Sequence, residues 1–394
     1  MSTTFDALGV SPALVAKLTE RGIETAFPIQ AMTIPDALAG LDVCGKAKTG
    51  SGKTLAFGIP VLERVAKAEP SRPRALALVP TRELAVQVHD ELAPLAEVVD
   101  RTVLAIYGGA NMERQIKALE RGVDLVVATP GRMIDLIDRK AVSVADLEQV
   151  IIDEADRMAD MGFLPQVEWI LRQVDEKHQT LLFSATLDGA VDRLVSRYQH
   201  EPMLHEVESK QVTVEEMAHR FLLVHEMDKV KVAASIARGA NRTMMFTRTK
   251  RAADRLARSL KDEGVSAAAI HGDLRQKERE RALSNFGEGQ LSVLVATDVA
   301  ARGIHVDDVD VVIHFDPPDD HKNYLHRSGR TARAGESGIV VTLVLWNEEL
   351  EIKRLQRRLG LDQPLVEVFS NDKRLADLAG WDPGTDEGSV ARAR

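Results

Sequence analysis

The chain has 394 residues, and its 51 Lys and Arg residues are outnumbered by 60 Asp and Glu residues, so its formal net charge is −9. Hydrophobic residues form 44% of the sequence, which is ample for packed cores and excludes a largely disordered chain. The acidic balance argues against a protein that coats nucleic acid by bulk charge, and an aromatic content of 4% argues against a binding face built on base stacking.

Three sequence features indicate the compartment. Cys44 is the single cysteine, so no internal disulfide can form, and a buried structural thiol in a reducing environment is expected. Residues 1–6 lack the basic and apolar run of a signal peptide. No run of about 18 apolar residues predicts a membrane span. We therefore expect a cytoplasmic protein that does not contact a membrane.

Short apolar, β-branched segments alternate with helix-length amphipathic segments along the chain. In chain order the apolar segments are residues 41–44, 75–79, 102–106, 124–128, 150–152, 180–183, 221–224, 243–246, 293–296, 309–313 and 339–343. Nearly continuous apolar strands that alternate with helices are typical of parallel sheets covered on both faces. The pattern predicts an α/β fold with two similar domains, which agrees with the chain length.

Changes in composition divide the chain into five segments. The stretch from Glu201 to Glu216 is polar with weak periodicity, which favours a linker. Near the N-terminus, Ser11 and Pro12 form a good N-cap and N1 pair for a helix. We expect an N-terminal region at 1–38, a first domain at 39–205, a linker at 206–216, a second domain at 217–370 and a loose tail at 371–394.

A glycine-rich segment follows the first predicted strand and precedes a predicted helix at 55–67. It comprises Ala47, Lys48, Thr49, Gly50, Ser51, Gly52, Lys53 and Thr54. In a strand–loop–helix context, glycines let backbone N–H groups approach phosphates, and the helix N-terminus favours negative charge. Lys53 would neutralise the β- and γ-phosphates, and Thr54 would hold Mg²⁺. Ala47 departs from the strict phosphate-loop pattern, which has glycine there.

An acidic cluster follows the predicted strand at 150–152. Asp153 is placed to hold Mg²⁺, partly through water, and Glu154 is placed to orient or deprotonate an attacking water. Alone, such a cluster is as typical of a solvated strand end as of a catalytic site. Together with the phosphate loop, it indicates nucleoside triphosphate hydrolysis.

These residues belong to a longer series of motifs that resembles the DEAD-box ATP-dependent RNA helicases of superfamily 2, in a bacterial-type minimal core. Asp153-Glu-Ala-Asp156 and the phosphate loop carry the resemblance first. In the same order as in the family follow segments 22–30 with Phe5 upstream, 80–85, 108–109, 129–132, 184–186, 246–249, 276–279, 296–298 with 301–303, and 326–333. Each string is short, but their order and spacing together are very specific.

The resemblance implies two tandem RecA-like domains with ATP between them and single-stranded RNA across one face of both. It implies that Gln30 reads the adenine edge. It also implies a catalytic set of Lys53, Asp153, Glu154, Arg330 and Arg333, the last two reaching the γ-phosphate, where guanidinium donors stabilise the transferring charge. Phe5, Ile23, Gly303 and His305 complete the expected ATP contacts, and Thr54 and Asp153 the Mg²⁺ site.

The resemblance also implies an RNA-binding set that grips sugar and phosphate and so carries no sequence information. Its members are Pro80, Thr81, Arg82, Gly109, Thr129, Gly131 and Arg132 in the first domain, and Arg248, Arg279 and Thr297 in the second. The residues expected to couple the nucleotide site to RNA are Asp156, Ser184, Thr186, His326 and Arg327.

The chain departs from the family pattern at several positions. Ile23 stands where an aromatic packs on adenine, and Ala26 and Phe27 stand where Pro and Thr are usual. His305 replaces a carboxylate that contacts the ribose, and Ala332 replaces a glycine between the two finger arginines. These changes put the affinity for ATP in question and leave the catalytic set intact.

The expected function is that of an ATP-dependent RNA helicase that separates short duplexes or remodels RNA–protein complexes and releases RNA on hydrolysis. Two alternatives stay open: an ATP-gated RNA clamp with little turnover, and a DNA-acting translocase of the same superfamily. The expected cofactors are ATP and Mg²⁺, and the expected partner is RNA, with ribosomal or RNA-decay proteins as candidates. A monomer is expected, and the sequence does not separate ribosome assembly, mRNA decay and cold adaptation.

Overall fold

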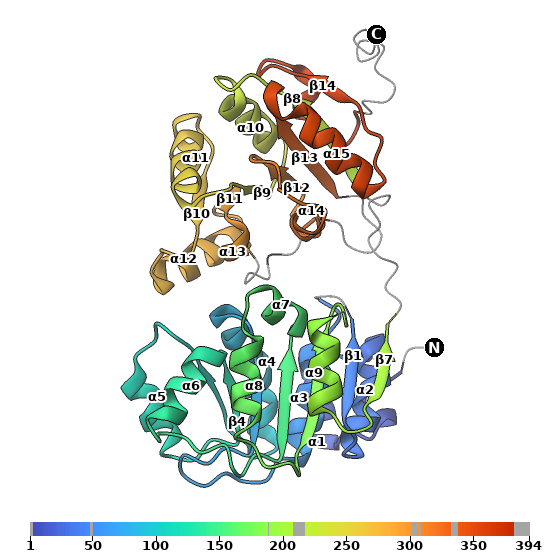
Figure 1. The fold of residues 1–394 in the computed structure, drawn as a ribbon, viewed down its shortest axis with the longest axis vertical. Coiled ribbons are helices and arrows are strands. Elements are labelled where there is room, and N and C mark those ends of the chain that lie inside the picture. The colour runs from blue at the N-terminus through green and yellow to red at the C-terminus, as the bar shows by residue number, and fades with distance from the viewer. Residues whose placement is uncertain are drawn as a thin grey trace. The chain divides into compact units, whose positions relative to one another are not determined.

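The computed structural model describes residues 3–47, 50–187, 189–207, 217–301, 306, 309–331 and 338–381. The chain forms two compact units, unit 1 at Met1–Ser209 and unit 2 at Lys210–Arg394. Figure 1 shows that each unit is built around a sheet with helices packed on it. No helix in these described ranges combines the length and apolarity that crossing a membrane requires.

Unit 1 is built on a seven-stranded parallel sheet. Its strands are β1 (Val43–Lys46), β2 (Ala75–Leu78), β3 (Val103–Ile106), β4 (Leu125–Ala128), β5 (Gln149–Asp153), β6 (Gln179–Ser184) and β7 (Met203–Glu206). Their order across the sheet is β3-β4-β2-β5-β6-β1-β7. All the carboxyl ends therefore lie at one edge, where ligands bind in folds of this kind.

Helices cover both faces of this sheet. They are η1 (Asp6–Leu8), α1 (Pro12–Glu20), α2 (Pro28–Leu38), α3 (Lys53–Arg64), α4 (Arg82–Val98), α5 (Met112–Leu119), α6 (Pro130–Asp138), α7 (Ala155–Asp160), α8 (Leu164–Leu171) and α9 (Ala190–Tyr198). Since successive strand residues point to opposite faces, Ile151 packs with α1–α4, whereas Val150 and Ile152 pack with α5–α9. The two buried faces explain the apolar residues of the central strands.

Unit 2 repeats the architecture on a second seven-stranded parallel sheet. Its strands are β8 (Ala218–Leu223), β9 (Thr243–Phe246), β10 (Ala267–Ile270), β11 (Val293–Ala296), β12 (Val311–His314), β13 (Ile339–Val344) and β14 (Leu365–Glu367). The order β10-β11-β9-β12-β13-β8-β14 is that of unit 1, with β8 in the place of β1, β9 in the place of β2, and so on to β14.

The helices of unit 2 also lie on both sides of its sheet. They are α10 (Lys229–Arg238), α11 (Lys250–Asp262), α12 (Gln276–Gly287), α13 (Asp298–Ala301), α14 (His321–Ser328), η3 (Trp346–Glu348), α15 (Glu349–Leu359) and η4 (Lys373–Ala376). One core joins the sheet to α10, α11 and η4, and two further cores join the other face to α12 and α13 and to α14 and α15.

The expected α/β architecture with parallel sheets is confirmed, but three strands escaped the sequence interpretation. β7 lies within the stretch assigned to a polar linker, and as an exposed edge strand it needs no apolar pattern. β10 has the sequence Ala-Ala-Ala-Ile, and alanine favours helices. β14 is a short edge strand of three residues.

The segment from 371 to 381 differs from the loose tail expected there. Residues Lys373–Ala376 form η4, and Leu375, Leu378 and Trp381 are buried in the core beneath α10. The charged residues between these apolar ones hid the pattern, because an irregular segment has no fixed period. This part of the tail therefore belongs to unit 2.

Candidate nucleotide and nucleic-acid site

The candidate phosphate loop joins β1 to α3 at the carboxyl edge of the unit 1 sheet. Gly50 and Gly52 both have φ of 82°, in the left-handed region that favours glycine, and Gly52 is the N-cap of α3. Lys53 begins α3 and is 7% exposed, and its Nζ donates to the Ala47 carbonyl oxygen at 3.1 Å. The loop thus combines a helix N-terminus with a nearly buried ammonium, as a phosphate site requires.

Gln30 and Phe27 border this loop from the start of α2. Gln30 Oε1 accepts from the Phe27 N–H at 2.8 Å, and Gln30 Nε2 donates to the Gly52 carbonyl oxygen at 2.9 Å. A Cβ on Gly52 would lie 2.4 Å from Gln30 Nε2 and 2.6 Å from Phe27 Cδ2, so only glycine fits there. Phe27 is 56% exposed. Sequence reasoning treated Phe27 only as a departure from a family pattern, whereas the fold places its ring beside the loop.

Asp153 and Glu154 lie together at the end of β5. Asp153 is 3% exposed, and its Oδ1 accepts from the Glu154 N–H at 2.9 Å. Burial raises the pKa of Asp153, and the nearby Lys53 ammonium opposes that rise. Glu154 has left-handed backbone angles, φ 52° and ψ 50°, which cost a non-glycine residue on the order of 1 kcal/mol. Its Oε2 accepts from Arg157 Nη1 at 2.6 Å, so backbone and ion pair together fix its position.

Ser184, at the end of β6, connects the two parts of the candidate nucleotide site. Its carbonyl oxygen accepts from the Ala47 N–H at 2.9 Å, at the start of the phosphate loop. Its Oγ accepts from the Asp156 N–H at 3.1 Å, in the helix that follows Glu154. Thr186, two residues beyond the strand, is exposed. Ser184 is therefore hydrogen-bonded to both parts of the candidate site.

The side chains of Asp153 and Thr54 supply the oxygen donors expected for Mg²⁺. Such hard donors fit this ion, which is commonly held by one or two carboxylates together with substrate phosphates. Burial raises the pKa of Glu91 of α4, and the Thr54 side chain opposes that rise. Within the described ranges no group of three acidic, His or Cys side chains could hold a metal by itself.

The expected RNA residues of unit 1 follow β2, β3 and β4. These strands form one half of the sheet, next to β5, β6 and β1, so the carboxyl edge divides into two adjoining halves. Thr81 is the N-cap of α4, and its Oγ1 accepts from the Leu84 N–H at 3.3 Å. A Cβ on Gly109, where φ is 88°, would lie 2.5 Å from Arg82 Nη1. The Arg82 guanidinium therefore packs on the glycine turn after β3.

Arg132 is the most enclosed of the basic residues expected to bind RNA in unit 1. Its side chain is 9% exposed, and Nη1 donates to Gln115 Oε1 at 2.7 Å and to the Ala110 carbonyl oxygen at 3.3 Å. Arg132 therefore braces the turn that carries Gly109. Pro80 is buried, Thr129 is half-buried and Gly131 is exposed.

Unit 2 places its expected RNA residues at the equivalent half of its sheet. Arg248 follows β9, Thr297 follows β11 and Arg279 lies on α12, where its Nη2 donates to the Ala300 carbonyl oxygen at 2.9 Å. Thr297 is 6% exposed. Arg248 is exposed and lies closest to solvent of the three.

Arg327 of α14 is the most tightly held of the expected coupling residues. Its Nε and Nη2 donate to the two carboxylate oxygens of Asp298 at 2.6 and 2.8 Å. Its guanidinium also lies 5.3 Å from the centre of the Phe246 ring. His326, on the same helix, is exposed, and Arg330 lies just beyond the helix and is half-buried. Residues Lys48, Thr49, Gly303, His305, Ala332 and Arg333 lie outside the described residues.

Phe5 contributes differently from what was expected, whereas the ATP contact expected of Ile23 stays a prediction. Phe5 is 1% exposed and belongs to the core of unit 1, so its ring offers no face to a nucleotide in this structure. We assign it to the packing of the N-terminal segment. Ile23 is half-buried and packs against the same core.

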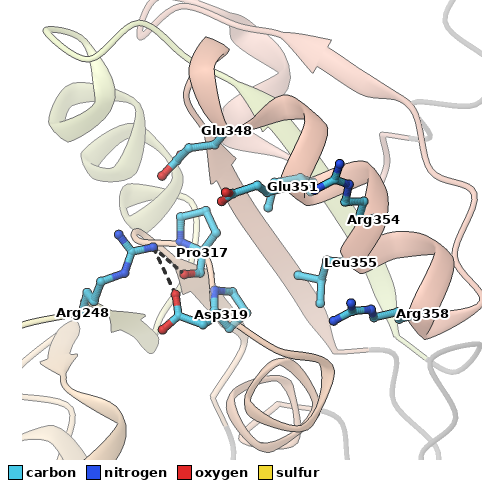
Figure 2. Close-up of a pocket in the computed structure, with 10 residues that line it drawn as sticks. Arg248, Pro317, Asp319, Glu348, Glu351, Arg354, Leu355 and Arg358 are labelled. Atoms are coloured by element: carbon cyan, nitrogen blue, oxygen red, sulfur yellow. Dashed lines mark hydrogen bonds and ion pairs between the residues drawn. The ribbon is translucent and has the colours of Figure 1, made fainter.

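A pocket of about 310 Å³ lies beside Arg248 in unit 2 (Figure 2). Arg248 Nη2 donates to the Pro317 carbonyl oxygen at 3.4 Å and lies 3.5 Å from Asp319 Oδ1. The charged residues that line it are Arg248, Arg354, Arg358, Asp319, Glu348 and Glu351. Three basic and three acidic side chains balance, which argues against a second phosphate site here.

The fold and the site define a class: helicase-type enzymes with two tandem RecA-like domains. A solved structure, S. cerevisiae Dbp5 bound to RNA and ADP BeF3, superposes with a TM-score of 0.79 at 29% identity, covering 94% of this chain and 97% of that chain. A family model described as DEAD/DEAH box helicase matches residues 27–194, and one described as helicase conserved C-terminal domain matches residues 225–335.

Curated relatives agree with these matches. The chain is 43% identical over 381 residues to the DEAD-box ATP-dependent RNA helicase CshA of Bacillus cereus (strain ATCC 10987 / NRS 248), covering 95% of this chain and 72% of the relative. It is also 43% identical over 357 residues to CshA of Geobacillus kaustophilus, covering 90% and 76%. The chain therefore belongs to the DEAD-box helicase family and is an enzyme of that class.

Proposed function

We propose that this DEAD-box helicase hydrolyses ATP to separate short RNA duplexes or remodel RNA–protein complexes, and that hydrolysis releases the RNA. The observation that carries the proposal is the carboxyl edge of unit 1, where the phosphate loop and Asp153-Glu154 adjoin the Arg82–Gly109 turn. The relatives named ATP-dependent RNA helicases, and the related structure bound to RNA and ADP BeF3, support it.

The proposed chemistry divides among residues whose geometry is favourable. Lys53 neutralises the β- and γ-phosphates, and Glu154 orients or deprotonates the attacking water once it is released from Arg157. Thr54 and Asp153 hold Mg²⁺, which when bound offsets phosphate charge. We further propose that Arg330 and Arg333 stabilise the transferring γ-phosphate, because guanidinium donors there lower the barrier.

Recognition of the base is proposed for Gln30 and Phe27. Gln30 is fixed between the Phe27 N–H and the Gly52 carbonyl oxygen, yet one amide hydrogen and one lone pair remain for an adenine edge. The exposed Phe27 ring offers the aromatic contact that Ile23 cannot, since aromatic stacking needs a π face. GTP that supported hydrolysis as well as ATP does would contradict the role of Gln30.

The deciding experiment compares ATP hydrolysis by the full chain with RNA, with single-stranded DNA and with neither. RNA should stimulate ATP hydrolysis and DNA should not. Equal stimulation by DNA would favour a DNA translocase. Multiple-turnover separation of a short RNA duplex without partner proteins should be measurable, and its complete absence would favour an ATP-gated clamp. Since the net charge is −9, RNA binding without nucleotide should be weak, with a shallow salt dependence.

The cellular setting is proposed on the same footing. The protein is expected to act as a monomer in the cytoplasm, on RNA of any sequence, with ribosomal or RNA-decay proteins as candidate partners. Burial raises the pKa of the Cys44 thiol to about 11, which keeps it protonated and unreactive, consistent with a structural role.

A further inference from the structure

Unit 2 carries a lysine–aspartate pair at the topological place of Lys53 and Asp153. Lys229 is the first residue of α10, which follows β8, just as Lys53 is the first residue of α3, which follows β1. Asp316 follows β12, the counterpart of β5. Lys229 Nζ lies 3.9 Å from Asp316 Oδ1. The pair is present although residues 224–228, before the helix, contain no glycine.

Groups of the protein itself lie around the N-terminal end of α10. The Asp228 carboxylate, at the N-cap, accepts from the Ser370 N–H at 2.7 Å and from its hydroxyl at 2.8 Å. Lys229 is 5% exposed, and its Nζ lies 4.8 Å from the centre of the Phe315 ring. The Asp228 carboxylate makes no capping hydrogen bond to α10, but its negative charge beside the helix end disfavours a phosphate there. The buried ammonium therefore acts within the unit.

Asp316 connects Lys229 to residues expected to meet RNA and the nucleotide. Its Oδ2 accepts from the Arg248 N–H at 2.8 Å, and its carbonyl oxygen accepts from Arg327 Nη1 at 2.7 Å. Arg327 in turn holds Asp298 through two charged hydrogen bonds. One carboxylate residue therefore fixes the turn that carries Arg248 and the helix that precedes Arg330.

We propose that Lys229 is a positioning residue for RNA binding, which holds Asp316 and through it the Arg248 turn. The ammonium is the countercharge of a three-quarters-buried carboxylate, where opposite charges interact more strongly than in water. Without it, Asp316 loses the attraction that keeps its Oδ2 on the Arg248 N–H. The effect on RNA rests on the proposed function, whereas the effect on the Arg248 turn does not.

The structural part is tested by amide hydrogen exchange of the full chain. In Lys229→Met, the Arg248 N–H should exchange about fivefold faster than in the wild type, since its acceptor is no longer held in place. Lys231→Met, an exposed lysine on the same helix with no ion pair among the described residues, is the matched control. Lys229→Arg should restore slow exchange. Unchanged exchange in folded Lys229→Met would overturn the proposal.

The functional part is tested by the RNA concentration that gives half-maximal stimulation of ATP hydrolysis. It should rise about fivefold in Lys229→Met, equivalent to about 1 kcal/mol, with a smaller change in maximal rate. Asp316→Asn should have a similar effect, and the double variant should be no worse than either single one, because both break one connection. Additive losses would place Lys229 outside this connection. Absence of any RNA stimulation in the wild type would instead contradict the proposed function, and the Arg248 exchange rates would still decide the role of Lys229.

Discussion

Units 1 and 2 have the same strand order, but the loops that follow β1 and β8 at the carboxyl edges of their sheets differ. After β1, the loop carries glycines at positive φ and leads to a helix that begins with the nearly buried Lys53. After β8, residues 224–228 contain no glycine, and the carboxylate of the N-cap Asp228 accepts two hydrogen bonds from Ser370. A parallel sheet thus fixes where a site can form, whereas the loop residues decide whether that place binds a ligand or serves as internal support.

The strongest test of the difference between the two units compares Lys53 with Lys229. Lys53→Met should lower kcat/KM for ATP, measured at saturating RNA, by about 100-fold or more, because preorganised charge at a phosphoryl group supplies several kcal/mol. Lys229→Met should lower kcat/KM for ATP far less at saturating RNA, since the proposed role of Lys229 is in RNA binding. Lys231→Met provides the control on the same helix. Comparable losses in the Lys53 and Lys229 variants would refute the division between ligand site and internal support.

Glu154 tests whether the edge of unit 1 alone sets the timing of RNA release. Glu154→Gln keeps the shape of the side chain and removes the proposed general base, so hydrolysis should fall about 100-fold. RNA should then dissociate more slowly in the presence of ATP, as measured by chase with unlabelled RNA. Glu113→Gln, at an exposed acid on α5, is the matched control. An RNA off-rate equal to that of the wild type would break the link between hydrolysis and release.

Substitution of Asp228 tests whether its contact with Ser370 stabilises the start of α10. Asp228→Ala removes two hydrogen bonds from Ser370 to a carboxylate, which should cost about 2 kcal/mol. Because the chain has two units, the loss should be read locally, as faster amide exchange in α10 and in residues near Ser370. Asp362→Ala, at an exposed acid without an ion pair in the described ranges, is the control. Amide exchange equal to that of the control would show that this contact does not stabilise the start of α10.

Sequence alone could predict the elements whose pattern reflects burial on both sides. The central strands β2, β5 and β12 were recognised because their residues are apolar on both faces. The edge strands β7 and β14 have exposed positions, so no apolar run marks them. Part of the C-terminal segment was missed because its three anchors, Leu375, Leu378 and Trp381, follow no helical or strand period.

The site divides in a similar way. Lys53, Asp153 and Glu154 lie in contiguous motifs, so their roles could be proposed from spacing. Lys229 and Asp316 are far apart in sequence and belong to no motif, so their pairing follows only from the fold. The sequence showed Phe27 only as a departure from the family pattern, because its position beside the phosphate loop depends on the fold. Gly52, which follows β1, lies next to the Phe27 ring only in the folded chain.

Phe27 gives the smallest expected effect and sharpens the comparison at the proposed base-binding position. The loop between β8 and α10, which is the unit 2 counterpart of the phosphate loop, carries Met227, which is 85% exposed. Met227→Ser is therefore a control substitution of an exposed apolar side chain at an edge that should bind no nucleotide. Phe27→Ser should raise KM for ATP about three- to tenfold, since an aromatic contact is worth ~1 kcal/mol. Phe27→Leu keeps apolar area without a π face and should fall between. If Phe27→Ser matches Met227→Ser, the ring does not meet adenine, and Ile23 alone must supply the apolar contact. If Phe27→Leu matches the wild type, burial of apolar area rather than stacking explains the effect.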